Sequence, residues 1–264
     1  MLKTTNFINW GVVMNRTKNN ITSIVYITVI VLLLFATGGC PGSLIPIRGN
    51  GNITQQNFPL NNFETVSVSG DWTVEITQSG TSSVTVDADR NLFDYLDIRV
   101  DGNHNLHIGF KKGYAISNTH CKASIKMPIL RRLTTSDSIT GEINSFNNMS
   151  GKAMSIAISG SGDITANGIK VKELALEISG SGDFKATGEA QTFTGSISGS
   201  GNIKAVDLET EKANISISGS GSAKVWVTNS LKAHISGSGS VLYKGNPANV
   251  IPDISGTGSV APLP

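Results

Sequence analysis

ISGSGDITANGIKVKELALEISGSG, residues 158–182, contains one full unit of a repeat that fills the second half of the chain. The copies of ISGSG begin at Ile158, Ile178, Ile197, Ile217 and Ile235, with the variant ISGTG at Ile254. Successive copies are 20, 19, 20, 18 and 19 residues apart. A period this short, without helix-forming residues in each unit, predicts a β-solenoid in which each repeat makes one turn.

Each unit contains two strand-like runs when the first isoleucine of ISGSG is taken as position zero. Apolar residues recur at positions −4 and −2, before the glycines, and at +6 and +8, after them. Spacing by two places these residues on one side of a strand. The S-G-S-G between the runs predicts a corner, because glycine permits backbone conformations that a Cβ excludes. The serines at +1 and +3 should form hydroxyl ladders along the stack.

Stacking explains how so short a unit can be stable. One unit cannot bury its apolar stripe alone, but units about 4.8 Å apart bury each isoleucine between its equivalents. Each buried aliphatic side chain contributes roughly 1.5–3 kcal/mol, which offsets the conformational entropy of the unit. Residues 150–264 are therefore predicted to form a parallel β-helix.

Residues 53–149 are predicted to be a second all-β region, packed on the repeats or continuous with them. Asp101-Gly102-Asn103 separates two apolar runs and predicts a hairpin, and residues 91–96 could form one helical turn. Residues 136–141 (SDSITG) resemble a decayed repeat, so the β-helix should begin before Met154. Apolar residues that alternate along the expected strands are Val66, Val68, Val74, Ile76, Val84, Val86 and Ala88.

The end of the chain contains residues that suit the open end of a solenoid. Tyr243 replaces the small residues of its column, and four prolines follow it. Proline cannot donate to a strand ladder, so prolines at a sheet edge discourage further strands from pairing. We expect Tyr243, Pro247, Pro252, Pro262 and Pro264 to form a C-terminal cap.

The first 39 residues resemble an export signal. Arg16 and Lys18 precede the apolar run ITSIVYITVIVLLLFA at 21–36, and small residues lead to Cys40. A cysteine at this point is typical of bacterial lipoproteins, in which it is lipidated and becomes the mature N-terminus. Residues 40–52 would then be a lipid-anchored tether, and the true start could be Met14. The alternative is a transmembrane anchor, since 16 apolar residues fall just short of a span.

Charge argues against nucleic acid as a partner. The predicted leader holds 3 of the 21 basic residues and no acid, so the remainder carries 18 bases against 19 acids, a net charge of −1. It has no basic stripe of the kind that nucleic-acid binding needs. Residues 41–43 (PGS) lack the acidic cluster that some bacteria use for surface display. We therefore expect an outer-membrane lipoprotein on the periplasmic side.

The search for catalytic chemistry finds one pair of acids. Asp163 and Asp183 share position +5, where stacked carboxylates could hold calcium or serve a polysaccharide-degrading enzyme. The same column continues as asparagine and serine, whereas calcium-binding repeats carry an acid in each unit. The repeated serines have no base placed beside them, so they are expected to be structural. No catalytic residue and no cofactor are predicted.

No metal site or disulfide is predicted either. His104 and His107 lie three apart in an expected hairpin strand, which sends their side chains to opposite faces. His120 and His234 stand alone in the sequence. If Cys40 carries lipid, Cys121 has no partner and should be a buried apolar residue.

Trp226 is the candidate surface contact. It lies between Val225 and Val227, which should face inward, so alternation points its ring outward. Its column, position +9, contains Val206 in the preceding unit and Lys244 in the next. An exposed tryptophan can stack on a sugar or anchor a protein interface. The alternative is that another part of the chain covers it.

An ordered series of motifs resembles the putative auto-transporter adhesin, head GIN domain family. It comprises GNGNI at 49–53, FETVSVSG at 63–70, VTVDAD at 84–89, LHIGFKKG at 106–113 and the SGSGD series. The resemblance implies a right-handed, pectin-lyase-like β-helix in a secreted or lipid-anchored bacterial protein, with no established catalytic residue. The chain departs from the family pattern at residues 68–72 (VSGDW), where a full SGSGD is usual.

The sequence thus favours a non-catalytic lipoprotein of the cell envelope whose β-helix is an adhesion or scaffolding surface. Its partners would be the membrane, through the anchor, and a glycan or envelope protein; a homo-oligomer is also possible. Two alternatives remain, a carbohydrate-binding module and a polysaccharide-degrading enzyme that uses Asp163 and Asp183.

Overall fold

The computed structural model describes residues 46–149 and 153–264. Residues Pro46–Pro264 form one compact unit, an all-β parallel β-helix of about six turns. This confirms the predicted fold class. The export signal and Cys40 lie outside the described residues.

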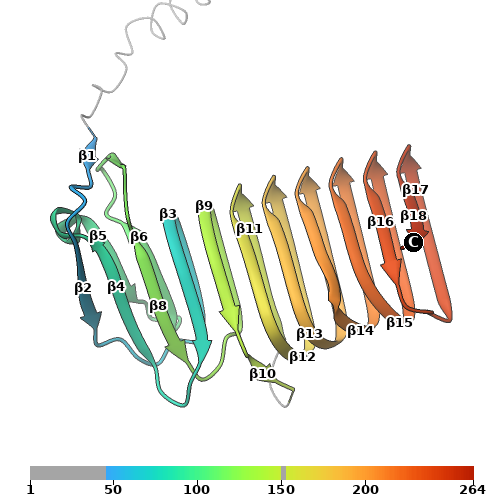
Figure 1. Ribbon diagram of the computed structural model, residues 1–264, viewed down its shortest axis with the longest axis horizontal. Helices are drawn as coiled ribbons and strands as arrows, with labels where there is room; N and C mark the ends of the chain where they lie inside the picture. The colour runs from blue at the N-terminus through green and yellow to red at the C-terminus, as the bar shows by residue number, and fades with distance from the viewer. Residues whose placement is uncertain (1–45, 150–152) are drawn as a thin grey trace, which may run out of the picture. The chain divides into compact units, whose positions relative to one another are not determined.

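The repeats form the regular part of the β-helix, whose strands stand side by side in one row (Figure 1). Neighbouring strands are parallel, and each ISGSG isoleucine pairs with the next from Ile158 to Ile254. From Ile158 to Ile235 these side chains are at most 1% exposed, so the predicted alignment and internal column are confirmed. The strands are β11 (Met154–Gly160), β12 (Asp163–Gly180), β13 (Asp183–Gly199), β14 (Asn202–Gly219), β15 (Ser222–Gly237), β16 (Ser240–Lys244), β17 (Asn249–Gly256) and β18 (Ser259–Pro262).

Each full rung has three sides, which the burial pattern of β12 shows. From Asp163 to Ile178 of β12, buried residues alternate with residues that are not buried, except at 167–168 and 172–173, where two successive residues are not buried. These breaks and the glycine corner divide the rung into three short inward-facing runs. β15 lacks the first break, because residues 206–208 of β14 have no partner in it. The sequence predicted two runs per unit, and the third, at 169–171, is too short to show in the periodicity.

The two glycines of each corner are required for different reasons. Gly199, at position +2, has φ = 132°, and a Cβ there would lie 2.3 Å from the Gly180 carbonyl oxygen. Gly182, at position +4, has no left-handed backbone, but a Cβ there would lie 2.4 Å from the carbonyl oxygen of Gly162 and 2.8 Å from Cγ2 of Ile158. The expectation that both glycines serve backbone conformation is therefore wrong at +4, where close packing excludes a side chain.

The β-helix continues into the N-terminal half, but not in chain order. Strand β3 (Thr65–Gln78) pairs along its length with β9 (Arg132–Asn144), and β9 pairs with β11 and β12. On its other side β3 pairs with β6 (Asn105–Phe110) and β8 (Lys122–Met127). The decayed repeat at 136–141 is in register with ISGSG, so the expectation that the β-helix begins before Met154 is confirmed.

In these first rungs large side chains replace the +4 glycine. Trp72 and Ile139 occupy that position, pair with each other and are 2% and 1% exposed. The Trp72 ring packs against Phe110 with ring centroids 5.7 Å apart. At position zero these two rungs carry Val68 and Thr135 in place of the isoleucine.

Antiparallel strands close the N-terminal end of the stack. β4 (Ser83–Asp89) pairs with β8 and β2 (Ile53–Phe58) with β4, while β5 (Leu96–Val100) forms the predicted hairpin with β6. The expected helical turn is a 3-10 helix, η1 (Arg90–Tyr95). The remaining strands are β1 (Ile47–Arg48), which pairs with β7 (Ile116–Ser117), and β10 (Asn147–Asn148), which pairs with β12.

The C-terminal end is open. Ile254 occupies position zero of the last described rung, and it is 41% exposed because no further described rung covers it. Leu263 N donates to Tyr243 O at 2.7 Å. Because successive backbone nitrogens of a strand point to opposite sides, the nitrogen of Pro262 faces the free edge, where it cannot donate a hydrogen bond. Tyr243 is half-buried and pairs with Pro262. These contacts support the predicted cap.

Candidate functional site

A ladder of serines runs along the outside of the sheet that contains the ISGSG isoleucines. We call this outer surface, formed by positions −3, −1 and +1, the serine face. The side chains at +1 are exposed except for the half-buried Ser136, so the predicted hydroxyl ladder is confirmed at this position. Strand pairing joins, in order, Ser69, Ser136, Ser159, Ser179, Ser198, Ser218, Ser236 and Ser255.

A hollow of about 390 Å³ lies beside the ladder in the C-terminal half of the serine face. Its outward side chains at −3 and −1 are short and polar on two rungs, Thr194, Ser196, Asn214 and Ser216. On the next rungs it is bordered by Lys232, His234, Ile251 and Asp253. His234 Nδ1 lies 2.8 Å from Asp253 Oδ2, and Ile251 is 52% exposed. The surface of the hollow is therefore largely apolar, and hydroxyls, an amide and charged groups surround it.

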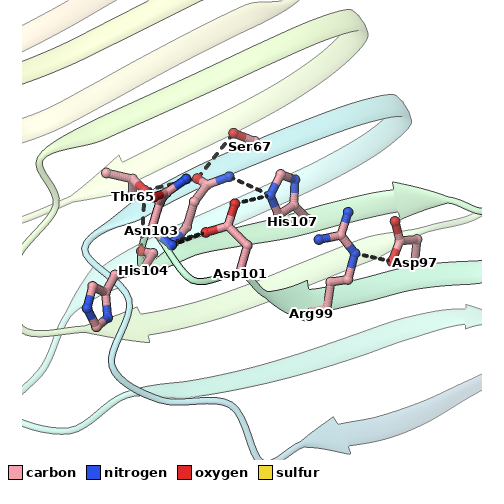
Figure 2. A network of polar contacts seen from close by, with 9 residues as sticks. Thr65, Ser67, Asp97, Arg99, Asp101, Asn103, His104 and His107 are labelled. Atoms are coloured by element: carbon pink, nitrogen blue, oxygen red, sulfur yellow. Dashed lines mark hydrogen bonds and ion pairs between the residues drawn. The ribbon is translucent and has the colours of Figure 1, made fainter.

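At the N-terminal end of the same face a polar network joins β3 to the hairpin (Figure 2). His107 Nε2 lies 2.9 Å from Asp101 Oδ2 and 2.9 Å from Asn105 Nδ2. Thr65 Oγ1 and Ser67 Oγ both donate to Asn105 Oδ1, at 3.0 and 3.2 Å. Hydrogen bonds from His107 and from the backbone N–H groups of Asn105 and Asn103 hold the pKa of the Asp101 carboxyl below its ordinary value.

This network borders a smaller hollow of about 230 Å³, lined in part by His107, Asp97 and Phe110. The remaining polar lining is the start of the serine face: Ser67, Ser69, Thr134 and Ser136. The Ser67 hydroxyl donates its hydrogen bond to Asn105 and not to His107. Ser67 and His107 therefore lack the contact between nucleophile and base that a serine hydrolase needs. The arrangement suits binding of hydroxyl-rich groups.

Asp163 and Asp183 lie on adjacent rungs, as predicted, but the structure commits Asp183 to its neighbours. Asn202 Nδ2 donates to Asp183 Oδ1 at 2.8 Å, and Lys204 Nζ forms an ion pair with Oδ2. Burial opposes ionisation of Asp183, but the bonds from Lys204 and Asn202 outweigh it and lower its pKa. A glycosidase acid needs a raised pKa, so Asp183 is poorly suited to that role.

Trp226 faces outward between the buried Val225 and Val227, as predicted, but it is half-buried. Its neighbours differ from the predicted column: Glu209, and not Val206, pairs with it on β14, because β15 skips the corner at 206–208. On the other side Lys244 Nζ lies 4.1 Å from the centre of its ring. The candidate contact role of Trp226 stays a prediction, now with a lysine over one ring face.

The histidines have more partners than the sequence indicated. His104 lies in the turn before β6 with φ = 58°, so the expected placement of both histidines in one strand is wrong. In Figure 2 the His104 ring points away from the network, and its Nδ1 lies 2.8 Å from Asn62 O. His120 Nδ1 lies 3.3 Å from Asp89 and His234 pairs with Asp253, so neither stands alone.

Cys121 is a buried free thiol, as expected. Burial and the nearby Asp89 and Asp71 carboxylates raise its pKa to about 12. Across residues 46–149 and 153–264, no group of three or more His, Cys, Asp or Glu side chains is placed to hold a metal ion. No helix in the same part of the chain is long and apolar enough to cross a bilayer.

The hollow at 194–253 is the feature that sequence reasoning missed. Its signal was the sequence of positions −3 and −1, which change from Ala and Glu to Thr, Ser and Asn on β13 and β14. The periodicity identified these positions as outward-facing, but it does not take the size of outward-facing side chains into account, and that size determines whether the surface is hollowed.

The sequence matches one family model over residues 62–247, which contain the solenoid from β3 to β16. The chain belongs to the putative auto-transporter adhesin, head GIN domain family. This confirms the resemblance of the motif series. A search among curated proteins finds no match.

Solved structures share the head GIN fold. A putative lipid binding protein from Parabacteroides distasonis is 29% identical with a TM-score of 0.70, and the match covers 83% of this chain and 100% of that one. A putative adhesin from the same organism is 25% identical with a TM-score of 0.60, covering 82% and 99%. A putative adhesin from Bacteroides fragilis is 21% identical with a TM-score of 0.73, covering 82% and 100%, and shows the fold alone. The family and these relatives are named as adhesins or binding proteins, and not as enzymes.

Proposed function

We propose that this protein is an exported, lipid-anchored adhesion protein of the bacterial cell envelope, which binds hydroxyl-rich ligands, such as glycans, through its serine face without catalysis. The observation that carries the proposal is the hollow at 194–253, which lies beside the continuous serine ladder on one regular sheet. Hydroxyls, an amide and the exposed Ile251 provide the mixed hydrogen-bonding and apolar contacts that a sugar requires.

The sheet also supplies rigidity, which favours binding of an extended ligand. Each inner rung is held on both sides by parallel ladders, and the isoleucine column is buried from Ile158 to Ile235. Because the serines are short and fixed in register, little side-chain entropy is lost when a ligand binds.

The test is binding of the purified protein to an array of neutral glycans and to immobilised mucin. Ser216→Arg places a long cation in the hollow and should abolish binding, whereas Ser220→Arg, at an exposed corner outside the face, should leave it unchanged. Both variants should have the melting temperature of the wild type, since surface substitutions usually change the free energy of unfolding by about 0.5 kcal/mol or less. Equal binding by Ser216→Arg, or no binding to any glycan or mucin, would refute the proposal. Binding only to phosphatidylcholine vesicles would indicate a lipid ligand instead.

The competing function is a polysaccharide-degrading enzyme that uses Asp163 and Asp183. The ion pair of Asp183 with Lys204 disfavours it. Release of reducing ends from a panel of polysaccharides, lost in Asp183→Asn, would establish it. Protease shaving of intact cells would decide the location, because we propose the periplasmic side of the outer membrane, where the protein should resist digestion.

A further inference from the structure

Three lysines occupy one outward position on successive rungs, on a different side of the β-helix from the serine face. We call the outer surface at positions +5, +7 and +9 the lysine face. Lys185 pairs with Lys204 and Lys204 with Lys224, and all three are exposed. Adjacent strands lie about 4.8 Å apart, and like charges directly opposite one another are destabilising. A row of this kind therefore carries a stability cost that an anionic ligand would relieve.

Acidic partners decrease along this row. Asp183, at position +5, neutralises Lys204. On the following rungs position +5 is occupied by the uncharged residues Asn202 and Ser222. Within residues 46–149 and 153–264, Lys185 and Lys224 form no ion pair. Glu209 is exposed beside Trp226 on β14, but among the described residues it forms no ion pair with Lys224 or Lys244, so these two lysines keep unpaired positive charge.

A fourth lysine extends the charge at the corner beyond β15. Lys244 pairs with Trp226 and its ammonium lies 4.1 Å from the ring centre, a geometry that holds the cation in place. Lys224 and Lys244 both line a hollow of about 530 Å³. Val206, Tyr243 and residues 262–264 provide its less polar walls.

We propose that the lysine face binds a polysaccharide that carries carboxylates, with Lys224 and Lys244 as the main contacts. The lysines follow the solenoid axis one rung apart, a spacing similar to the length of one sugar unit, so a linear polymer can present successive carboxylates to successive ammonium groups. Val206, Tyr243 and Pro262 can pack against the carbon faces of the sugar rings. Trp226 is a positioning residue that acts through Lys244. Because this site lies on another side of the rung, it can fail or succeed independently of the proposed function.

The experiment measures affinity of the purified protein for polygalacturonate, with dextran as the neutral control. The wild type should bind polygalacturonate and not dextran, and its affinity should fall as NaCl rises from about 50 to about 200 mM. Lys224→Ala combined with Lys244→Ala should weaken binding about tenfold or more. The matched control is Lys172→Ala, which removes an exposed lysine at a distant corner and should change nothing.

Further variants and ligands separate the explanations. Lys224→Arg keeps the charge and should retain binding, while Trp226→Phe should preserve more affinity than Trp226→Ala because phenylalanine still offers a ring to Lys244. Equal affinity of the double alanine variant and the wild type would overturn the proposal. So would equal binding to dextran, or binding to phosphatidylglycerol vesicles without binding to polygalacturonate.

Discussion

Asp89 accepts a hydrogen bond from the backbone N–H of Gly51 at 2.5 Å, although the two residues lie 38 positions apart. The same side chain is fully buried and accepts a second bond from the backbone N–H of His120 at 2.9 Å. A Cβ on Gly49 would lie 2.4 Å from Asp89 Oδ2, so the chain passes directly over the carboxylate. Residues 49–51, which the sequence assigned to a tether, are thus fastened to the body of the β-helix.

Asp89→Asn should lower the free energy of unfolding. The amide has one acceptor oxygen instead of two, so one of the two backbone N–H groups loses its acceptor and faces a buried NH2 group, at a cost of about 1–3 kcal/mol. The measurement is urea unfolding at neutral pH. Asp94→Asn, at an exposed position, is the control and should unfold at the same urea concentration as the wild type. Identical midpoints for the two variants would contradict the role given to Asp89.

Acid should weaken the protein through the same carboxylate. Burial opposes ionisation of Asp89, but the bonds from Gly51 and His120 outweigh it and hold its pKa below the ordinary 3.8. A lowered pKa gives stability that is complete above the ordinary value and is lost as pH falls through the folded value. The wild type should therefore lose more stability below about pH 4 than Asp89→Asn does. Parallel curves of melting temperature against pH would count against this explanation.

Ile217→Asp should unfold the middle of the stack. Ile217 is fully buried between Ile197 and Ile235, and an unpaired carboxylate there costs several kcal/mol. Ser218→Asp is the matched control, because Ser218 is exposed and the change should cost less than about 1 kcal/mol. Hydrogen exchange should show damage in neighbouring rungs before distant ones. Similar melting temperatures for both variants would refute the buried column.

Cys121 should resist alkylation. With a pKa of about 12, its thiolate fraction at pH 8 is on the order of 10⁻⁴, and burial also restricts access. Peptide mapping after iodoacetamide treatment should find Cys121 unmodified in the native protein and modified in urea. Modification in the native state at the rate of free cysteine would show that the thiol is accessible.

Cys40→Ser should release the protein from the membrane. If Cys40 carries lipid, its acyl chains supply the hydrophobic binding energy, so the variant should partition into the aqueous phase after detergent extraction. Its melting curve should match that of the lipidated protein. Retention in the detergent phase would favour an uncleaved transmembrane anchor.

The repeat half could be predicted almost completely from the sequence. The spacing of Ile158, Ile178 and their equivalents gave the register, because each rung repeats the same buried position. The failures occur where a rung changes length: β15 skips the corner at 206–208, and this gave Trp226 the neighbour Glu209 in place of Val206. The shorter rung appears in the sequence only as the spacing of 18 residues from Ile217 to Ile235, which does not show where in the rung residues are missing.

The candidate sites were only partly visible. Outward positions such as Ser198 and Lys204 follow from alternation, so the ladders could be expected. The hollows depend on the sizes of side chains on neighbouring strands, and the free charges depend on the ion pair that joins Asp183 to Lys204 and not to Lys224. Hollows and ion pairs depend on contacts between particular side-chain atoms, and the periodicity of the sequence does not specify those contacts.

The sequence by itself determined the rung, its corner glycines and its buried column, because a 19-residue unit can satisfy its apolar stripe only by stacking on copies of itself. Only the tertiary structure decided the order of the first rungs. There β3 lies between β8 and β9, and Gly70 N donates to Asp137 Oδ2 across 67 residues. The repeat has decayed at residues 68–72 and 136–141, so that pairing depends on shape, burial and polar contacts that form only when distant segments meet.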